Sequence, residues 1–374
     1  MPFRLPTRVT IRPGCRDEAV DSVRRARPRH ALVVLDRGLE RVEAARLDTA
    51  LESSGLRVSV FDGIESNPRD GIVDRLADRS RDDGVDLVVG IGGGSVLDAA
   101  KAVAMLIRNP GGCARYEGKN RFEHVPVPFV ALPTTCGTGS EVTWVSVLSL
   151  ETERRKVSIK GDAMFPADAW VDADLLRTLP AGLVASTGMD TLTHAVEAYV
   201  GRAANPVSDV LAEAAVRLVL RYLPRATADI ENDDEAREAM AQASTIAGIA
   251  FGNADVAGVH CLSESIGGMF DVPHGLANAV LLVPVLRYQL GAAGGRLARL
   301  AAAAGADGSG GGAMIDAIDR LVHAVAIPGF AALGIDAAEF PAIAAQAERN
   351  NSNGSNPMPM SAADYVRVLE ETAR

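Results

Sequence analysis

The first half of the chain alternates between short apolar runs and longer stretches in which apolar residues recur at helical spacing. Four runs predict strands, at residues 31–36 (ALVVLD), 56–62 (LRVSVFD), 85–94 (VDLVVGIGGG) and 127–133 (VPFVALP). The stretch 39–55 has periodic apolar positions and closes on Gly55, which predicts a helix. Strand and helix segments that alternate in this way predict a parallel sheet covered on both faces.

The pattern changes after Leu179 and Pro180. The remainder is rich in Ala and Leu and predicts helices at 181–200, 206–223, 234–251, 275–290 and 361–372. We therefore expect an α/β domain over residues 1–177 and an all-helical domain over residues 178–374. Two polar segments of the second half, 308–312 (GSGGG) and 350–356 (NNSNGSN), are interpreted as flexible connections without chemistry.

Composition narrows the class of protein. The chain has 374 residues, of which 48% are hydrophobic, and no apolar run of about 18 residues that would span a bilayer. Its start lacks the features of a signal or transit peptide. The four cysteines have no C-x-x-C spacing, which indicates reduced thiols in the cytoplasm. A net charge of -10 without a basic cluster argues against nucleic-acid or anionic membrane partners.

A glycine triplet follows the third predicted strand and opens a helix. Glycine lets backbone N–H groups approach a pyrophosphate closely, and the start of a helix adds a partial positive charge. The triplet is Gly92, Gly93 and Gly94. It does not follow the G-x-G-x-x-G pattern, and a tight turn between strand and helix is the alternative to phosphate binding.

A second polar loop follows the next predicted strand, in ALPTTCGTGSEVT. It supplies hydroxyl groups around two glycines, from Thr134, Thr135, Thr138 and Ser140. Ligands of open α/β sheets bind beyond the carboxyl ends of the strands, where both loops are expected. Together the two loops predict a nucleotide site.

Asp36 closes the first predicted strand. Its carboxylate could accept hydrogen bonds from the adenosine ribose and would repel a 2′-phosphate, so we expect NAD rather than NADP. An aspartate that only caps a helix or makes a turn is the alternative.

Three histidines and an aspartate suggest a metal site in the second half. Asp190 and His194 are four residues apart in a predicted helix and project from the same face. His260 and His274 are fourteen apart, and the segment 267–273, with two glycines and a proline, could turn the chain back between them. One carboxylate and three imidazoles suit Fe(II) or Zn and suit Ca or Mg poorly. Ordinary core or surface histidines are the alternative.

Four motifs resemble those of the iron-containing (group III) alcohol dehydrogenase family. They are GGGSVLDAAK (92–101), PTTCGTGSEVT (133–143), GMDTLTHAVEAY (188–199) and the VH to PHGLANA segment (259–279), and the resemblance extends from about residue 30 to residue 290. It implies a Rossmann-like nucleotide-binding α/β domain followed by a helical domain, the fold shared with dehydroquinate synthase-like proteins. Members of the family are commonly dimers or larger homo-oligomers.

The resemblance also assigns roles to residues. The positions that match the family's metal ligands are Asp190, His194, His260 and His274. Those that match its nucleotide site are Asp36, Gly92, Gly93, Gly94, Ser95, Asp98, Thr134, Thr135, Thr138, Ser140 and the cofactor-side Lys156.

Two positions depart from the family pattern. In NPMP (356–359) members more often show Asn-Pro-Arg, so Met358 removes a charge there, and we expect a packing consequence rather than a chemical one. The other departure changes the chemistry. Members usually carry a further histidine four residues after the one at position 260, and this chain has Glu264 there. Glu264 could relay a proton, become a fifth metal ligand, select a substrate with a cationic or hydroxyl-rich end, or only fill space. We assign it, with His274, to catalysis.

The implied function is that of an NAD(H)-dependent alcohol dehydrogenase or aldehyde reductase. A divalent metal, Fe(II) before Zn, would polarise the oxygen of a small alcohol or aldehyde while hydride passes to or from the nicotinamide. Three alternatives stay open. The first is an enoate reductase like maleylacetate reductase, although enzymes of that kind generally lack the metal ligands. The others are a lyase like dehydroquinate synthase and a non-catalytic NAD-binding protein.

Overall fold

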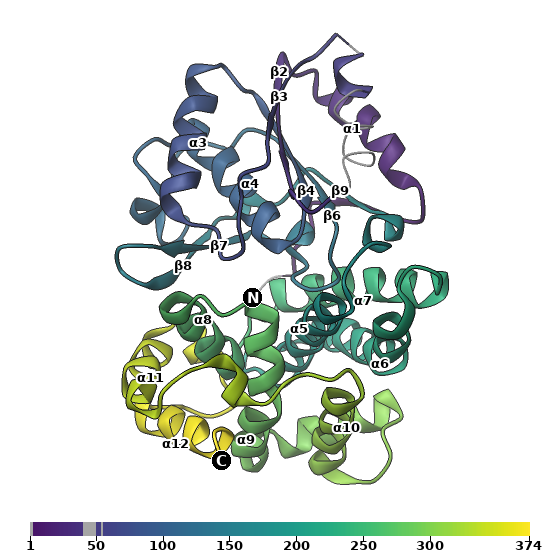
Figure 1. Ribbon diagram of the computed structural model, residues 1–374, viewed down its shortest axis with the longest axis vertical. Helices are drawn as coiled ribbons and strands as arrows, with labels where there is room; N and C mark the ends of the chain where they lie inside the picture. Colours follow the sequence, from purple (N-terminus) through teal and green to yellow (C-terminus); the bar gives the residue numbers. More distant parts are fainter. Residues whose placement is uncertain (1–2, 40–49, 54) are drawn as a thin grey trace. The chain divides into compact units, whose positions relative to one another are not determined.

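The chain folds into two compact units. The computed structural model describes residues 3–39, 50–53 and 55–374. An α/β unit comprises Leu5–Thr135 and Gly139–Arg177, and a helical unit comprises Thr178–Arg374 with Cys136–Thr138 and the start of the chain up to Arg4 (Figure 1). The helix expected over 39–55 falls largely outside the described residues. Its end is described, and Gly55 there has a φ of 80°, the left-handed conformation that commonly closes a helix.

Six parallel strands form the sheet of the α/β unit, in the order β1-β9-β6-β4-β2-β3. The strands that correspond to the four predicted ones are β2 (His30–Leu35), β3 (Arg57–Phe61), β4 (Leu87–Gly92) and β6 (Phe129–Pro133). The short strands β1 (Arg8–Ile11) and β9 (Asp168–Val171) were not expected. Every residue of β4 and β6 is buried, because helices cover both faces of a parallel sheet.

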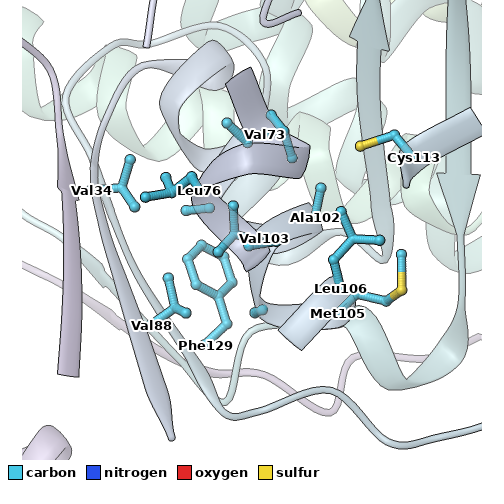
Figure 2. Packing of buried hydrophobic residues seen from close by; sticks show 14 of the residues in the cluster. Val34, Val73, Leu76, Val88, Ala102, Val103, Met105, Leu106, Cys113 and Phe129 are labelled. Carbon is cyan, nitrogen blue, oxygen red and sulfur yellow. The ribbon is translucent and has the colours of Figure 1, made fainter. Parts of the chain in front are cut away.

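Helices cover the sheet as the strand and helix pattern predicts. α3 (Asp70–Asp82) and α4 (Gly94–Arg108) lie on one face, and α1 (Ala19–Ala26) lies on the other (Figure 1). Between the sheet and α3 and α4, Val88 and Phe129 pack against Leu76 and Val103 in the main apolar cluster (Figure 2). The predicted α/β class of this unit is confirmed.

A small second sheet packs against α4 and was not expected. It contains β5 (Gly118–Lys119), β7 (Val145–Leu150) and β8 (Arg155–Lys160), and β7 runs antiparallel to β8. The Val147 backbone N–H donates to Asp98 Oδ2 at 2.9 Å, and the Ser146 hydroxyl donates to the Asp98 carbonyl at 2.8 Å. This sheet therefore holds Asp98 of α4 in place.

All regular elements of the helical unit are helices, within the described residues from Thr178 onward. Its long helices are α5 (Ala181–Val200), α6 (Pro206–Asp229), α7 (Asp234–Gly252), α8 (Gly258–Phe270), α9 (His274–Ala304), α10 (Gly310–Ala324), α11 (Phe340–Arg349) and α12 (Ala362–Thr372). Five match the predicted helices, and α8, α10 and α11 were not expected. Because α10 begins at Gly310, the segment 308–312 is partly helical and is not simply a flexible connection.

Two helices form the centre of this unit. α5 packs against α6, α7 and α9, and every residue from Gly188 to Val200 is buried. α9 has the length and apolar composition of a membrane span, but 61% of that apolar window is buried inside the structure, as in a core helix. Polar side chains on a helix as buried as α5 need hydrogen-bond or ionic partners, so they are candidates for a functional site.

Candidate metal centre and nucleotide loops

Three ionisable side chains line one face of α5. Asp190, His194 and Glu197 follow one another at spacings of four and three residues, so they lie on the same side of the helix. Their exposed fractions are only 1%, 4% and 2%. Burial of two carboxylates and an imidazole on one helical face is costly unless the groups are paired or bind an ion.

The four predicted metal ligands converge. One donor atom from each of Asp190, His194, His260 and His274 lies within 4.8 Å of the others. The Nε2 atoms of His194 and His260 are 3.0 Å apart, and His274 Nε2 is 3.7 Å from Asp190 Oδ1. Atoms that bind one ion at about 2.1 Å lie roughly 3.0 to 3.5 Å from each other. The ligand atoms are near this spacing, and those that are farther apart would move inward by a small amount when an ion binds.

A turn between α8 and α9 brings the last two histidines together. His260 lies in the first turn of α8, and His274 is the first residue of α9. The turn lies within the segment 267–273, as expected from its two glycines and proline. Gly267 and Gly268 still belong to α8, and the chain turns just after them at Asp271, which has a φ of 57° and caps α8.

Close packing of α9 on α5 keeps His274 beside Asp190. A Cβ atom on Gly275 would lie 2.7 Å from the Ser186 carbonyl oxygen of α5, well inside contact distance. Only glycine allows the two backbones to approach this closely. His274 is also the most accessible ligand, with 25% of its side chain exposed, whereas the other three are almost fully buried.

Glu197 links the metal ligands to the start of α8, and the sequence analysis missed it. Its carboxylate accepts the backbone N–H groups of Ala257 and Val259 at 2.8 and 2.7 Å. It also lies 2.6 Å from Nδ1 of His260. A carboxylate from α5 thus caps α8, where unpaired N–H groups and the helix dipole favour negative charge. The helical spacing from Asp190 and His194 was a signal that could have identified it.

The electrostatics of the cluster favour a divalent cation. Glu197 favours the proton of His260 on Nδ1, which leaves the Nε2 lone pair directed at the other ligands. Burial lowers the pKa of His194 to about 4, so this imidazole is neutral and can coordinate near neutral pH. Burial also lowers the pKa of His260, but Glu197 and then Asp190 outweigh it and raise the pKa above its ordinary value.

The two buried carboxylates pair with histidines and with no permanently charged side chain among the described residues. Across the described ranges, no Lys or Arg forms an ion pair with Asp190 or Glu197. A divalent ion bound by the one carboxylate and three neutral imidazoles would balance both charges. The residues present therefore fit a transition-metal ion such as Fe(II) or Zn(II).

Glu264 lies one helical turn after His260 on α8 and is half-buried. The Asn350 side-chain amide donates to Glu264 Oε2 at 2.7 Å. Asn350 begins the segment 350–356, which we expected to be a flexible connection, and the structure corrects this. Ser352 and Ser355 of the same segment donate hydrogen bonds to Asp255 at 3.0 and 2.7 Å, so the segment is fixed to the helices and holds Glu264.

The predicted nucleotide residues lie at the carboxyl ends of three adjacent strands. In the sheet, β4 lies between β2 and β6, so the strands that precede Asp36, the glycine loop and the threonine loop are neighbours. The Thr134 N–H donates to the Gly92 carbonyl at 3.0 Å, and the Asp36 N–H donates to the Ile91 carbonyl at 2.9 Å. Asp36 Oδ1 also accepts the Gly38 N–H at 2.8 Å, the turn role that was the alternative for this residue.

The glycine loop leaves the start of α4 open. A Cβ atom on Gly93 would lie 3.0 Å from Thr135, so a larger residue would push the two loops apart. Gly93 caps α4 without a side-chain hydrogen bond, and the helix starts at Gly94 and Ser95. The free N–H groups of this first turn form a site that suits a phosphate.

Asp98 and Ser140, both predicted to bind the cofactor, are hydrogen-bonded to each other. The Ser140 hydroxyl donates to Asp98 Oδ1 at 2.6 Å. Lys101, which the sequence analysis did not single out, donates from Nζ to the Ser140 carbonyl at 2.9 Å and to the Val145 carbonyl at 2.7 Å. Burial lowers the pKa of Lys101 to about 8. These residues position the loops.

Lys156 and Thr138 lie in different surroundings. Burial raises the pKa of Asp98 above its ordinary value. The positive charge of Lys101 opposes this increase, and that of Lys156 in β8 opposes it more weakly. Thr138 belongs to Cys136–Thr138, which groups with the helical unit. The Thr191 hydroxyl of α5 holds this segment through the Cys136 carbonyl, at 2.7 Å.

Comparison with known proteins covers nearly the whole chain. The family models described as "Iron-containing alcohol dehydrogenase" and "Fe-containing alcohol dehydrogenase family, C-terminal" match residues 6–173 and 184–373. The 1,3-propanediol dehydrogenase of Citrobacter freundii is 39% identical over 91% of this chain and 90% of its own length. The NAD-dependent methanol dehydrogenase of Bacillus methanolicus is 34% identical over 98% of each chain. A solved 1,3-propanediol oxidoreductase superposes with a TM-score of 0.94, at 34% identity over 99% of both chains.

Proposed function

Since the chain belongs to the iron-containing alcohol dehydrogenase family, we propose that it interconverts small alcohols and aldehydes with NAD(H) and a bound divalent metal. The observation that carries this proposal is the convergence of four buried or half-buried ligand atoms within 4.8 Å. Fe(II) is the metal that we propose, from the family, and the same donor set also suits Zn(II).

The chemistry divides between the groups that the protein binds and its own side chains. When bound, the metal supplies Lewis-acid polarisation of the substrate oxygen and NAD(H) supplies or accepts the hydride. Asp190, His194, His260 and His274 would hold the metal, and Glu197 keeps the His260 ring in the tautomer that can coordinate. His274, the ligand most open to solvent, is the one that we place beside the substrate.

The α/β unit would bind the cofactor through backbone and hydroxyl donors. The first turn of α4, with Gly93, Gly94 and Ser95, would take the pyrophosphate. Thr134, Thr135 and Thr138 would donate from the second loop, and Asp36 would accept from the adenosine ribose. Asp98, Ser140 and Lys156 stay predictions as cofactor-side residues, and the hydrogen bond between Asp98 and Ser140 also positions the two loops.

We also propose a cytoplasmic location and a homodimer or larger assembly. All four cysteines, Cys15, Cys113, Cys136 and Cys261, are buried and free of disulfides, which supports a reducing compartment. The assembly is what the family resemblance implies. The complete ligand set argues against an enoate reductase, whose relatives generally lack it, and the relatives' names support an oxidoreductase rather than a lyase.

A substrate screen tests the function. Purified protein loaded with Fe(II) should oxidise NADH in the presence of short aldehydes or hydroxyaldehydes, measured at the nicotinamide absorbance band. Because Asp36 would repel a 2′-phosphate, kcat/KM with NADPH should be at least about tenfold lower than with NADH. Better catalytic efficiency with NADPH would overturn the assignment of Asp36, and bound NAD without any net absorbance change would indicate lyase chemistry.

Glu264 is the side chain that we propose for proton transfer. Asn350 binds only one of its carboxylate oxygens among the described contacts, and the residue is half-buried one turn from a metal ligand. Glu264→Gln keeps the shape and removes the carboxylate that could transfer a proton, so it should alter the pH dependence of kcat. Glu348→Gln, an exposed change on α11, is the matched control. Identical pH profiles for wild type and Glu264→Gln would leave Glu264 with no role in proton transfer.

A further inference from the structure

A fifth side chain reaches the ligand cluster. Asn278 lies on α9, four residues after His274, and is completely buried. Its amide nitrogen is 2.6 Å from Asp190 Oδ1 and 3.2 Å from the Nε2 atoms of both His260 and His274. The amide of Asn278 thus contacts three of the four predicted metal-ligand atoms, although Asn278 is not itself one of the four ligands.

The orientation of the amide follows from its partner. Asn278 Oδ1 is buried without a hydrogen-bond partner, which is costly. Rotating the amide by 180° would bring Oδ1 against the carboxylate oxygen of Asp190, and two acceptors at 2.6 Å repel each other. The N–H group therefore faces Asp190, where the hydrogen bond to a charged acceptor is strong enough to offset the unpaired oxygen.

Asp190 Oδ1 can accept the hydrogen bond from Asn278 and bind a metal ion at the same time. A carboxylate oxygen has two lone pairs, so it can accept the Asn278 N–H and still bind a metal. The imidazole lone pairs of His260 and His274 would turn to the ion, and the hydrogen bond to Asp190 would remain. Without an ion, the same amide donates into the cluster and holds the ligand atoms together.

We propose that Asn278 is a positioning residue that orients Asp190 and preorganises the metal site. The inference rests on the metal-dependent function proposed above, and it adds a determinant of metal affinity that acts through Asp190. Partners of this kind usually contribute about 10- to 100-fold in metal affinity.

The test measures metal binding directly, with Zn(II) as the probe and a chromophoric chelator as competitor. Asn278→Leu keeps the approximate volume but removes the donor, and it should weaken Zn(II) binding about 10- to 100-fold. Gln289→Met is the matched control, because Gln289 is also a buried amide of α9 and donates to Asn356 at 2.7 Å, with no described hydrogen bond to any of the four ligands. Thermal unfolding of the metal-free proteins should show comparable destabilisation of both variants, while only Asn278→Leu loses metal affinity.

A second variant separates a donor from a ligand. Asn278→Asp places an oxygen where the N–H group stands, so a direct metal ligand would keep or gain affinity, whereas a donor to Asp190 would lose it. Retained or increased affinity in Asn278→Asp would overturn the proposal, as would unchanged affinity in Asn278→Leu or an equal loss in the Gln289 control. Wild-type protein that binds no Zn(II) or Fe(II) would instead refute the metal-dependent function, and the role of Asn278 with it.

Discussion

Replacing His260 by alanine is expected to remove the bound metal and to lower kcat/KM for aldehyde reduction about a thousandfold or more. His260 contributes one of three imidazoles, and its Nε2 atom is only 3.0 Å from that of His194, at the centre of the cluster. Without it the site keeps three of its four ligands, and the Glu197 carboxylate loses the imidazole that it orients, so a transition-metal ion is held much less firmly. Loss of Lewis-acid polarisation removes several kcal/mol of transition-state stabilisation, and each 1.36 kcal/mol is about a factor of ten.

The measurement combines metal analysis of the purified protein with NADH oxidation. His323→Ala is the control, because this histidine is 80% exposed on α10 and belongs to the same helical unit. Adding Fe(II) or Zn(II) back should restore chelator-treated wild type but not His260→Ala. Undiminished hydride transfer by His260→Ala would rule out the metal mechanism.

Replacing Glu197 by alanine is expected to destabilise the fold by about 3 kcal/mol or more and to weaken metal binding about 10- to 100-fold. The change leaves two buried backbone N–H groups, from Ala257 and Val259, and the His260 ring without their acceptor. Each buried donor left unpaired costs about 1 to 3 kcal/mol. The His260 imidazole would also be free to adopt the wrong tautomer.

Urea unfolding of the metal-free protein and Zn(II) competition separate the two effects. Glu197→Gln retains an acceptor oxygen but loses the charge, so its losses should be intermediate in both measurements. Glu213→Ala removes another carboxylate, whose hydrogen bond in the described part of the chain is from the Tyr199 hydroxyl of α5, and should leave metal affinity unchanged. Wild-type stability and affinity in Glu197→Ala would show that the cap and the tautomer are fixed by other groups.

The buried strands and long helices were predictable because their environment leaves a simple pattern. β4 and β6 are covered on both faces, so they appear as continuous apolar runs that any scan of hydrophobicity detects. β8, with the sequence RKVSIK, has only two apolar residues and three charged ones, so it lacks the continuous apolar run that identifies β4 and β6. Its pairing with β7 depends on tertiary packing against α4, which local pattern does not contain.

The metal ligands could be predicted from the sequence because most of them are histidines, a residue type that is rare in this chain. Histidines are rare in this chain, so four ligands in two segments were easily seen. Glu197, Asn278 and Asn350 belong to common residue types whose roles depend on what they touch. Spacing on α5 could have identified Glu197, but no local feature shows that Asn350 reaches Glu264 across 86 positions of the chain.

The double use of Glu197 has an evolutionary consequence. One carboxylate both anchors the first turn of α8 and orients a metal ligand, so these two properties cannot drift independently. A descendant that abandoned its metal would still need an acceptor at this position, or a rebuilt start of α8. An acidic residue three positions after the α5 histidine can therefore persist in homologues that have lost the ligands, and its presence alone is no indicator of metal dependence.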